Sequence, residues 1–156
     1  PLNFLTSNPN ELKSLVEMIK TEKEYPYPEY ASWILTHFVK IENSSVKSFQ
    51  KELIDFILSP SSNQTLLRNV VNVLVQLKID EYKESEMLDR LMEFVKNGEN
   101  KVALQVYSIQ LFVQYIKKYP ELKDELSSLV DLYTEGRTSA YHASVRDFHK
   151  KVKKIK

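Results

Sequence analysis

Three histidines are the residues of this 156-residue chain best suited to hold a metal ion: His37, His142 and His149. His142 and His149 are seven positions apart, so in a helix they fall on one side, about two turns from each other. Zinc-binding pairs on a helix are instead spaced by three or four positions. His37 stands within an apolar pattern, where we expect a buried or half-buried core histidine with a hydrogen-bond partner. We therefore predict no metal site.

Other kinds of chemistry lack the residues that they need. The chain has no cysteine, which excludes disulfides, thiol catalysis and cysteine-bound zinc or iron–sulfur clusters. Its two glycines, Gly98 and Gly136, are too few for a phosphate-binding loop or a dinucleotide fingerprint. No serine or carboxylate has the sequence context of a nucleophile elbow. We predict no catalytic residue and no cofactor, and expect a protein that is not an enzyme, with a triad assembled only in space as the alternative.

Carboxylates gather in three separate segments and could bind a basic partner. The alternative interpretation is the solvated side of amphipathic helices, whose charge Lys51, Arg90 and Lys123 offset. The carboxylates are Glu52, Asp55, Glu86, Asp89, Glu93, Asp124, Glu125 and Asp131.

The last residues, "RDFHKKVKKIK", concentrate positive charge, and the candidate phosphate contacts are Arg146, Lys150, Lys151 and Lys154. Lysines are also favoured at a helix C-terminus by the helix dipole. The interleaved Phe148, Val152 and Ile155 indicate the buried side of the same helix. We prefer the interpretation as an ordinary helix end, because no basic stripe continues onto the segments that carry the carboxylates.

The elements that carry these residues are helices. Between positions 100 and 118 the apolar arc is so wide that the helix must be covered on more than one side. Steps of 36 along the chain take Ala103, Val106, Tyr107, Ile109 and Val113 onto Leu67, Val70, Val71, Val73 and Leu77, and then onto Ala31, Ile34, Leu35, His37 and Ile41. Steps of 38 relate Leu53, Ile54, Phe56 and Ile57 to Leu91, Met92, Phe94 and Val95, and to Leu129, Val130, Leu132 and Tyr133.

The punctuation of the chain follows this second step, because Pro60, Gly98 and Gly136 are separated by the same interval. A period of about 37 built from two helices is typical of an α-solenoid. We predict an all-α fold, an α-α superhelix of about eight helices in about three and a half repeats. The predicted helices are 9–20, 29–41, 44–58, 64–78, 84–97, 100–118, 121–135 and 139–154, with Asn8 capping the first.

As a single domain, residues 1–156 divide into an N-terminal helix and link, 1–24, three helix pairs, 25–60, 61–98 and 99–137, and a capping helix with the basic tail, 138–156. The link leads into Tyr25-Pro26-Tyr27-Pro28 and Tyr30, which could form a recognition loop. We expect instead that these tyrosines cover the exposed end of the first repeat, next to Trp33.

The paired helices resemble HEAT and armadillo-type repeats. The stretches "KVALQVYSIQLFVQYIKK", "TSAYHASVRDFHKKVKKI" and "YPYPEYASWILTHFV" are similar to a group of small bacterial HEAT-like proteins without an assigned biochemical function. Members of that group sometimes carry the label adenylosuccinate lyase. Lyases of that superfamily have a Gly-Ser-Ser-x-Met-Pro-x-Lys-x-Asn loop, but Met18, Met87 and Met92 have neither the proline nor the serine pair beside them. The lyase activity is therefore not supported.

The resemblance implies a non-catalytic scaffold. It also implies where a partner binds, because second helices commonly line the concave surface of HEAT-like stacks. We predict protein binding on that surface through Asp55, Asp89, Arg90, Glu93, Asp124 and Asp131. Nucleic-acid binding by the tail is the alternative, although a net charge of +1 argues against it. No stretch predicts a membrane span or a signal peptide, and we expect a cytoplasmic protein. A chain that begins at Pro1 leaves open whether a leader was removed.

Overall fold

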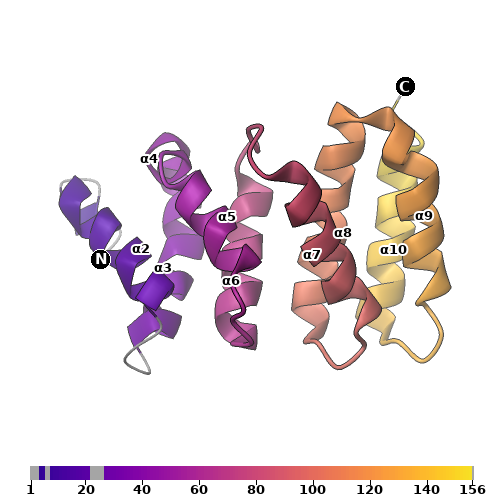
Figure 1. Ribbon diagram of the computed structural model, residues 1–156, viewed down its shortest axis with the longest axis horizontal. Helices are drawn as coiled ribbons and strands as arrows, with labels where there is room; N and C mark the ends of the chain where they lie inside the picture. Colours follow the sequence, from indigo (N-terminus) through magenta and orange to yellow (C-terminus); the bar gives the residue numbers. More distant parts are fainter. Residues whose placement is uncertain (1–3, 6–7, 22–26, 156) are drawn as a thin grey trace. The chain divides into compact units, whose positions relative to one another are not determined.

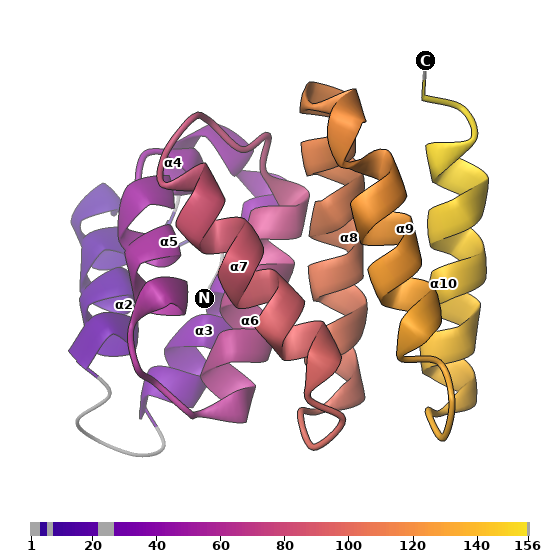
Figure 2. The ribbon, with the colours of Figure 1, turned by 45° about the vertical axis from the view of Figure 1, so that its right-hand side comes forward.

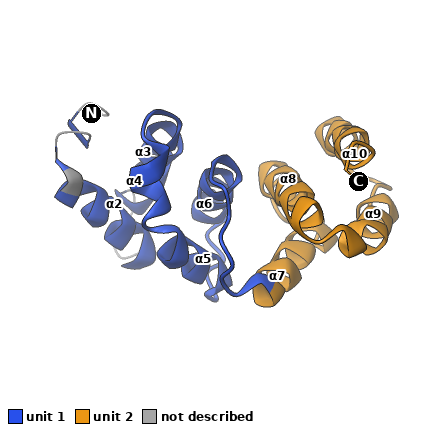
Figure 3. Ribbon diagram, turned by 90° about the horizontal axis from the view of Figure 1, so that it is seen from above, with its two compact units in different colours: residues 1–84 blue, residues 85–156 orange. Residues whose placement is uncertain are grey.

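The computed structural model describes residues 4–5, 8–21 and 27–155, and in this part of the chain all regular structure is helical. The chain forms two compact units, residues 1–84 and 85–156 (Figure 3). Among the described helices, none combines the length and the apolar composition that crossing a membrane requires.

Unit 1 contains five of the helices labelled in Figure 1, in two layers. They are α2 (Pro9–Thr21), α3 (Tyr27–Ile41), α4 (Asn43–Lys47), α5 (Gln50–Leu58) and α6 (Gln64–Gln76). Helices α3 and α6 pack against each other in one layer, and α2 and α5 form the other (Figure 3). Apolar side chains at helical spacing, such as Leu35 and Val39 of α3 and Val70 and Val73 of α6, are fully buried. Their burial holds the layers together.

Polar side chains also join α3 to α6. Asn69 Nδ2 donates to Ser32 Oγ at 2.9 Å, and both residues are buried. Asn63 Nδ2 donates to Glu29 Oε1 at 2.9 Å. The Asn63 side chain also accepts from the Leu66 amide at 3.1 Å and so caps α6. Helices that are one repeat apart in the sequence are therefore direct neighbours, as the periodicity predicts.

Unit 2 also has two layers. Helices α8 (Val102–Lys118) and α10 (Ser139–Val152) form one, and α7 (Glu84–Lys96) and α9 (Lys123–Leu132) the other, as Figures 2 and 3 show. A 3-10 turn, η1 (Pro120–Leu122), precedes α9. Helix α8 packs against α9 and α10, and its buried residues include Leu104, Phe112 and Ile116. Tyr141 Oη donates to the Val130 carbonyl at 3.0 Å and ties α10 to α9.

The predicted helices are found within a few residues of their expected positions, with one exception. Residues 44–58 were expected to form one helix but form two, α4 and α5. At the break the Phe49 amide donates to the Val46 carbonyl at 2.9 Å, three positions back, and Ser48 Oγ donates to the Ser45 carbonyl at 2.7 Å. A tight turn and a serine that bonds the backbone interrupt the α-helical ladder there.

Two predictions about side chains near the first repeat have different outcomes. His37 is half-buried, as expected, but its ring contacts that of Trp33, with centroids 4.5 Å apart, and within the described residues it has no hydrogen bond. Tyr25 and Pro26 lie outside the described residues. Tyr27 and Tyr30 belong to α3 and are exposed, as is Trp33. The prediction that these tyrosines cover the end of the repeat is therefore wrong for Tyr27 and Tyr30.

Candidate protein-binding surface

Asp55, the candidate on α5, already has partners within unit 1. Lys83 Nζ lies 2.9 Å from Asp55 Oδ1, and Tyr82 Oη lies 2.9 and 3.0 Å from the two carboxylate oxygens. The hydrogen bond to Asp55 is the main cause that raises the pKa of the Lys83 ammonium. On the alkaline side of neutrality, the Lys83 ammonium therefore keeps its charge and the ion pair persists until the pH rises above the ordinary lysine value. Asp55 is thus occupied in holding a connection of the chain.

That connection, residues 77–83, is anchored on α4 and α5 by further side chains. Gln50 Nε2 donates to the Lys78 carbonyl at 3.1 Å, and Gln50 Oε1 accepts from the Asp80 amide at 2.9 Å. Lys47 Nζ lies 3.2 Å from Asp80 Oδ1. Sequence analysis missed these residues. A single glutamine in an amphipathic helix does not indicate that its side chain bonds the backbone of a connection about 30 residues later.

Replacing Gln50 with alanine is expected to lower the free energy of unfolding by about 2 kcal/mol, because a part-buried backbone carbonyl and a backbone amide lose their partner. The Asp80 amide is expected to exchange its hydrogen faster. Urea unfolding and hydrogen exchange measure the two effects. Lys47→Ala, which removes only a partly exposed ion pair on the same connection, should cost no more than about 1 kcal/mol. Equal effects of the two variants would contradict the anchoring by Gln50.

Helix α7 turns its charged candidates away from the core. Its apolar residues Met87 and Leu91 are buried, whereas Asp89 and Glu93 are exposed. Arg90 Nη1 lies 3.3 Å from Glu93 Oε2. The Arg90 guanidinium lies over the Phe94 ring, 4.6 Å from its centroid. Asp89, Arg90 and Glu93 therefore share one outward surface, and part of its charge is paired within the helix.

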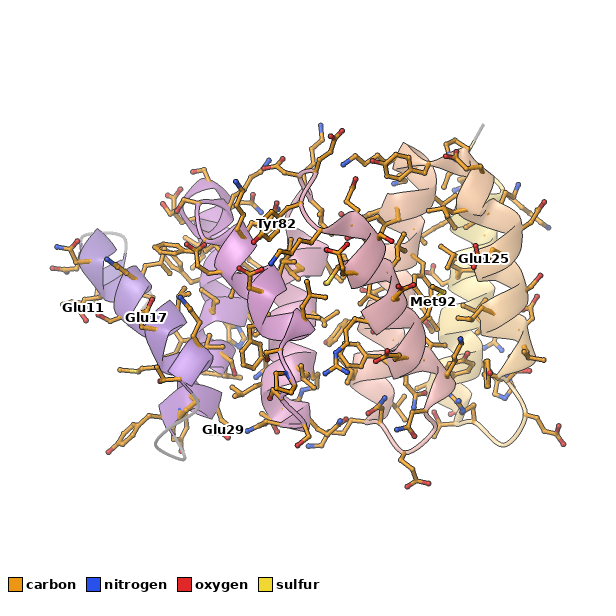
Figure 4. The ribbon with its side chains drawn as sticks, viewed as in Figure 1. Glu11, Glu17, Glu29, Tyr82, Met92 and Glu125 are labelled. Atoms are coloured by element: carbon orange, nitrogen blue, oxygen red, sulfur yellow. The ribbon has the colours of Figure 1, made fainter. Side chains whose placement is uncertain are left out.

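Helix α9 carries the remaining candidates. Asp124 and Asp131 are both exposed, and so is Glu125 (Figure 4). Asp131 Oδ1 lies 2.7 Å from His149 Nε2 of α10. We define the acidic surface as the exposed carboxylates of the second helices of unit 2, namely Glu86, Asp89, Glu93, Asp124, Glu125 and Asp131. Helices α7 and α9 form the same layer of this unit (Figure 3). Asp55, by contrast, belongs to unit 1.

The candidate basic residues lie on α10 and directly after it. Arg146 and Lys150 of α10 and Lys154, which follows the helix, are exposed. Lys151 is exposed too, and its Nζ lies 2.8 Å from Asp147 Oδ2, one turn earlier. Phe148 and Val152 are buried, which confirms that the apolar residues of this segment form the inner side of the helix.

Arg137 is a structural residue that sequence analysis did not find. Its Nη1 donates to Gln105 Oε1 at 3.0 Å and its Nη2 to the Lys96 carbonyl at 3.1 Å. The guanidinium also lies 5.9 Å from the Tyr133 ring centroid and 5.0 Å from that of Tyr141. The one signal in the sequence is that Arg137 directly follows Gly136, a glycine at a turn, where φ is +73°.

No group of three or more histidines, aspartates or glutamates is placed to hold a metal ion among the residues that the structure describes.

A family model described as a HEAT repeat domain matches residues 2–156. Neither a curated protein nor a solved structure matches the chain.

Proposed function

Because the chain belongs to the HEAT repeat family, we propose that it is a non-catalytic scaffold that binds another protein, through the acidic surface of unit 2. The family match confirms the α-α superhelix predicted from the repeat in the sequence. HEAT repeats typically serve as protein-binding scaffolds and are usually not catalytic. The finer assignments, a cytoplasmic protein that is not an enzyme and that binds on its second helices, are part of this proposal.

One observation supports the choice of surface. The exposed sides of α7 and α9 are rich in carboxylates. Of the basic residues on these two helices, Arg90 and Lys123 are only partly exposed, and Lys96, the last residue of α7, is exposed. An excess of negative charge on one layer favours a partner with a basic segment, since complementary charge raises the association rate and excludes unsuitable partners. The structure also narrows the candidates. Glu93 and Asp131 are paired within the chain, so Asp89 and Asp124 are the better anchors.

Charge reversal tests the assigned surface. Partners are captured from native cells with the unmodified chain and identified, and the capture is then repeated with the double variant Asp89→Lys and Asp124→Lys. We expect recovery of the partner to fall at least about tenfold, since two attractive contacts become repulsive.

The matched control is Glu11→Lys with Glu17→Lys on α2, which changes the net charge equally at exposed positions of unit 1 (Figure 4). Unchanged recovery with the α7–α9 variant would contradict the proposed surface. An equal loss with both variants would also contradict it, because net charge and not this surface would then decide binding.

Nucleic-acid binding through α10 is the second candidate. Helices α8 and α10 both end at the side where the chain turns through η1 (Figures 1 and 2). The exposed basic residues there include Lys117 and Lys118 of α8, Lys150 of α10, and Lys154, which follows α10. Titration of a labelled duplex tests this candidate, because each phosphate contact adds about −0.9 to the slope of log affinity against log salt. No binding at low salt would exclude it, whereas steep salt dependence that Lys150→Glu weakens would support it.

A further inference from the structure

The outward side of α3 exposes large aromatic and apolar side chains to water. Tyr30, Trp33 and Ile41 are 61%, 56% and 59% exposed, and His37 lies between them, half-buried against Trp33. Spacings of three and four positions place all four on one face of the helix. We call Tyr30, Trp33, His37 and Ile41 the α3 stripe.

The same repeat positions of α6 are covered. The step that relates α3 to α6 in the sequence leads from the α3 stripe to Leu66, Asn69, Val73 and Leu77, none of which is more than 6% exposed. The hydrogen bond from Asn69 to Ser32 shows that α3 lies against this face of α6. The α3 stripe is therefore the repeat equivalent of a helix-packing face. Among the described residues, the helix that would pack on it is missing.

Helix α2, which lies beside α3 in the other layer, also exposes a side chain at a repeat position that is buried in the next helix. Met18 of α2 is 43% exposed, whereas Phe56, at the same repeat position on α5, is 5% exposed. Helices α2 and α3 lie together at one end of unit 1 (Figure 3). Both helices at this end thus expose a side that is buried in the next helix of the same layer.

The residue types of the α3 stripe indicate a partner that binds reversibly. At the covered positions, α6 has the aliphatic residues Leu66 and Val73, and Leu77 follows directly after the helix. Tyrosine, tryptophan and histidine combine a large apolar body with a polar atom, so they tolerate both water and burial. Tyrosine and tryptophan are also enriched among the residues that contribute most to protein–protein binding. A face that stays permanently buried does not need such side chains.

We propose that the α3 stripe binds an amphipathic helix of a partner protein, whose contacting side carries small and aliphatic residues. The side of α3 that covers α6 shows this composition. Ser32 on this side bonds Asn69 of α6. Thr36 and Val39, four and seven positions later, lie on the same side of α3 and are buried. Helices with anchors at such spacings are a common way in which proteins recognise one another. The inference concerns unit 1 and does not depend on the acidic surface.

A second copy of the chain suits this face less well. Two stripes placed together would oppose bulky rings with no small residues between them.

Trp33 is the only tryptophan of the chain, so its fluorescence reports directly on the α3 stripe. The probe is a synthetic peptide of residues 27–41 that carries Trp33→Ala, because α3 is the helix that covers the equivalent face of α6. We expect the peptide to shift the emission of Trp33 to shorter wavelength and to protect it from acrylamide. A control peptide that also carries Ser32→Glu and Val39→Glu should have no effect, because its contacting side is charged.

Protein variants locate the binding. Ile41→Glu keeps the reporter and is expected to raise the dissociation constant at least about tenfold, because it places a charge in the contact. Leu132→Glu, at an exposed position on α9, should leave the constant unchanged. No response of Trp33, an equal response to the control peptide, or indifference to Ile41→Glu would each overturn the proposal. A shift that grows with protein concentration alone, together with a dimer in sedimentation, would assign the face to a second copy and overturn it as well.

Discussion

Replacing Phe112 with alanine is expected to lower the free energy of unfolding by about 3–5 kcal/mol. Phe112 is fully buried in α8, the helix whose wide apolar arc predicts neighbours on more than one side. Removing the ring forfeits its transfer free energy and leaves a cavity that rigid neighbouring helices fill only in part. Because the total stability of a domain is about 5–15 kcal/mol, this loss is large enough to unfold part of the population at physiological temperature.

Chemical denaturation followed by circular dichroism measures this loss. Leu132→Ala is the matched control, because this apolar residue is 72% exposed on the neighbouring α9 and should change stability by no more than about 0.5 kcal/mol. A Phe112 variant that loses less than about 1 kcal/mol would show that α8 is not an inner helix.

The second large effect is expected at Arg137, whose replacement by alanine should cost about 2–3 kcal/mol. Its guanidinium donates to Gln105, which is 1% exposed, and a buried acceptor left without its donor is costly. The contacts with the rings of Tyr133 and Tyr141 contribute about 0.5–1 kcal/mol each where they are partly shielded from water.

Arg137→Lys separates charge from geometry. A lysine keeps the positive charge but cannot offer the planar pair of donors that reaches both Gln105 and the Lys96 carbonyl. We therefore expect it to restore less than half of the lost stability in the same unfolding measurement. Full restoration by lysine would show that charge alone explains the role of Arg137. Hydrogen exchange should further show that the loss is concentrated in α9, α10 and the loop between them.

The helices could be predicted from the sequence because burial itself imposes the pattern. Ala31 and Leu67 occupy the same repeat position and are both 1% exposed, and Ser32 and Asn69 join the two helices on which they lie. Such a period survives in the residue types, since every inner helix must hide the same sides. The break between α4 and α5 left no comparable trace, because one serine bond and one tight turn do not disturb the apolar spacing.

The partners of the charged candidates could not be predicted in the same way. Asp55 has the spacing of a solvated helix residue, and only the path of the 77–83 connection brings Lys83 and Tyr82 to it. The exposure of Trp33 depends likewise on whether another helix lies over α3. The pattern of the residues marks a packing position but does not say what occupies it. Sequence therefore predicted the elements well and the free surfaces poorly.

A double-mutant cycle between Ser32 and Asn69 tests the central claim most directly, which is that helices one repeat apart pack against each other. The free energies of unfolding of the unmodified chain, Ser32→Ala, Asn69→Ala and the double variant are measured by urea denaturation. Because Asn69 Nδ2 donates to Ser32 Oγ across α3 and α6, we predict a coupling energy of at least about 0.5 kcal/mol. Single losses that simply add in the double variant would place the two residues apart and contradict the repeat architecture.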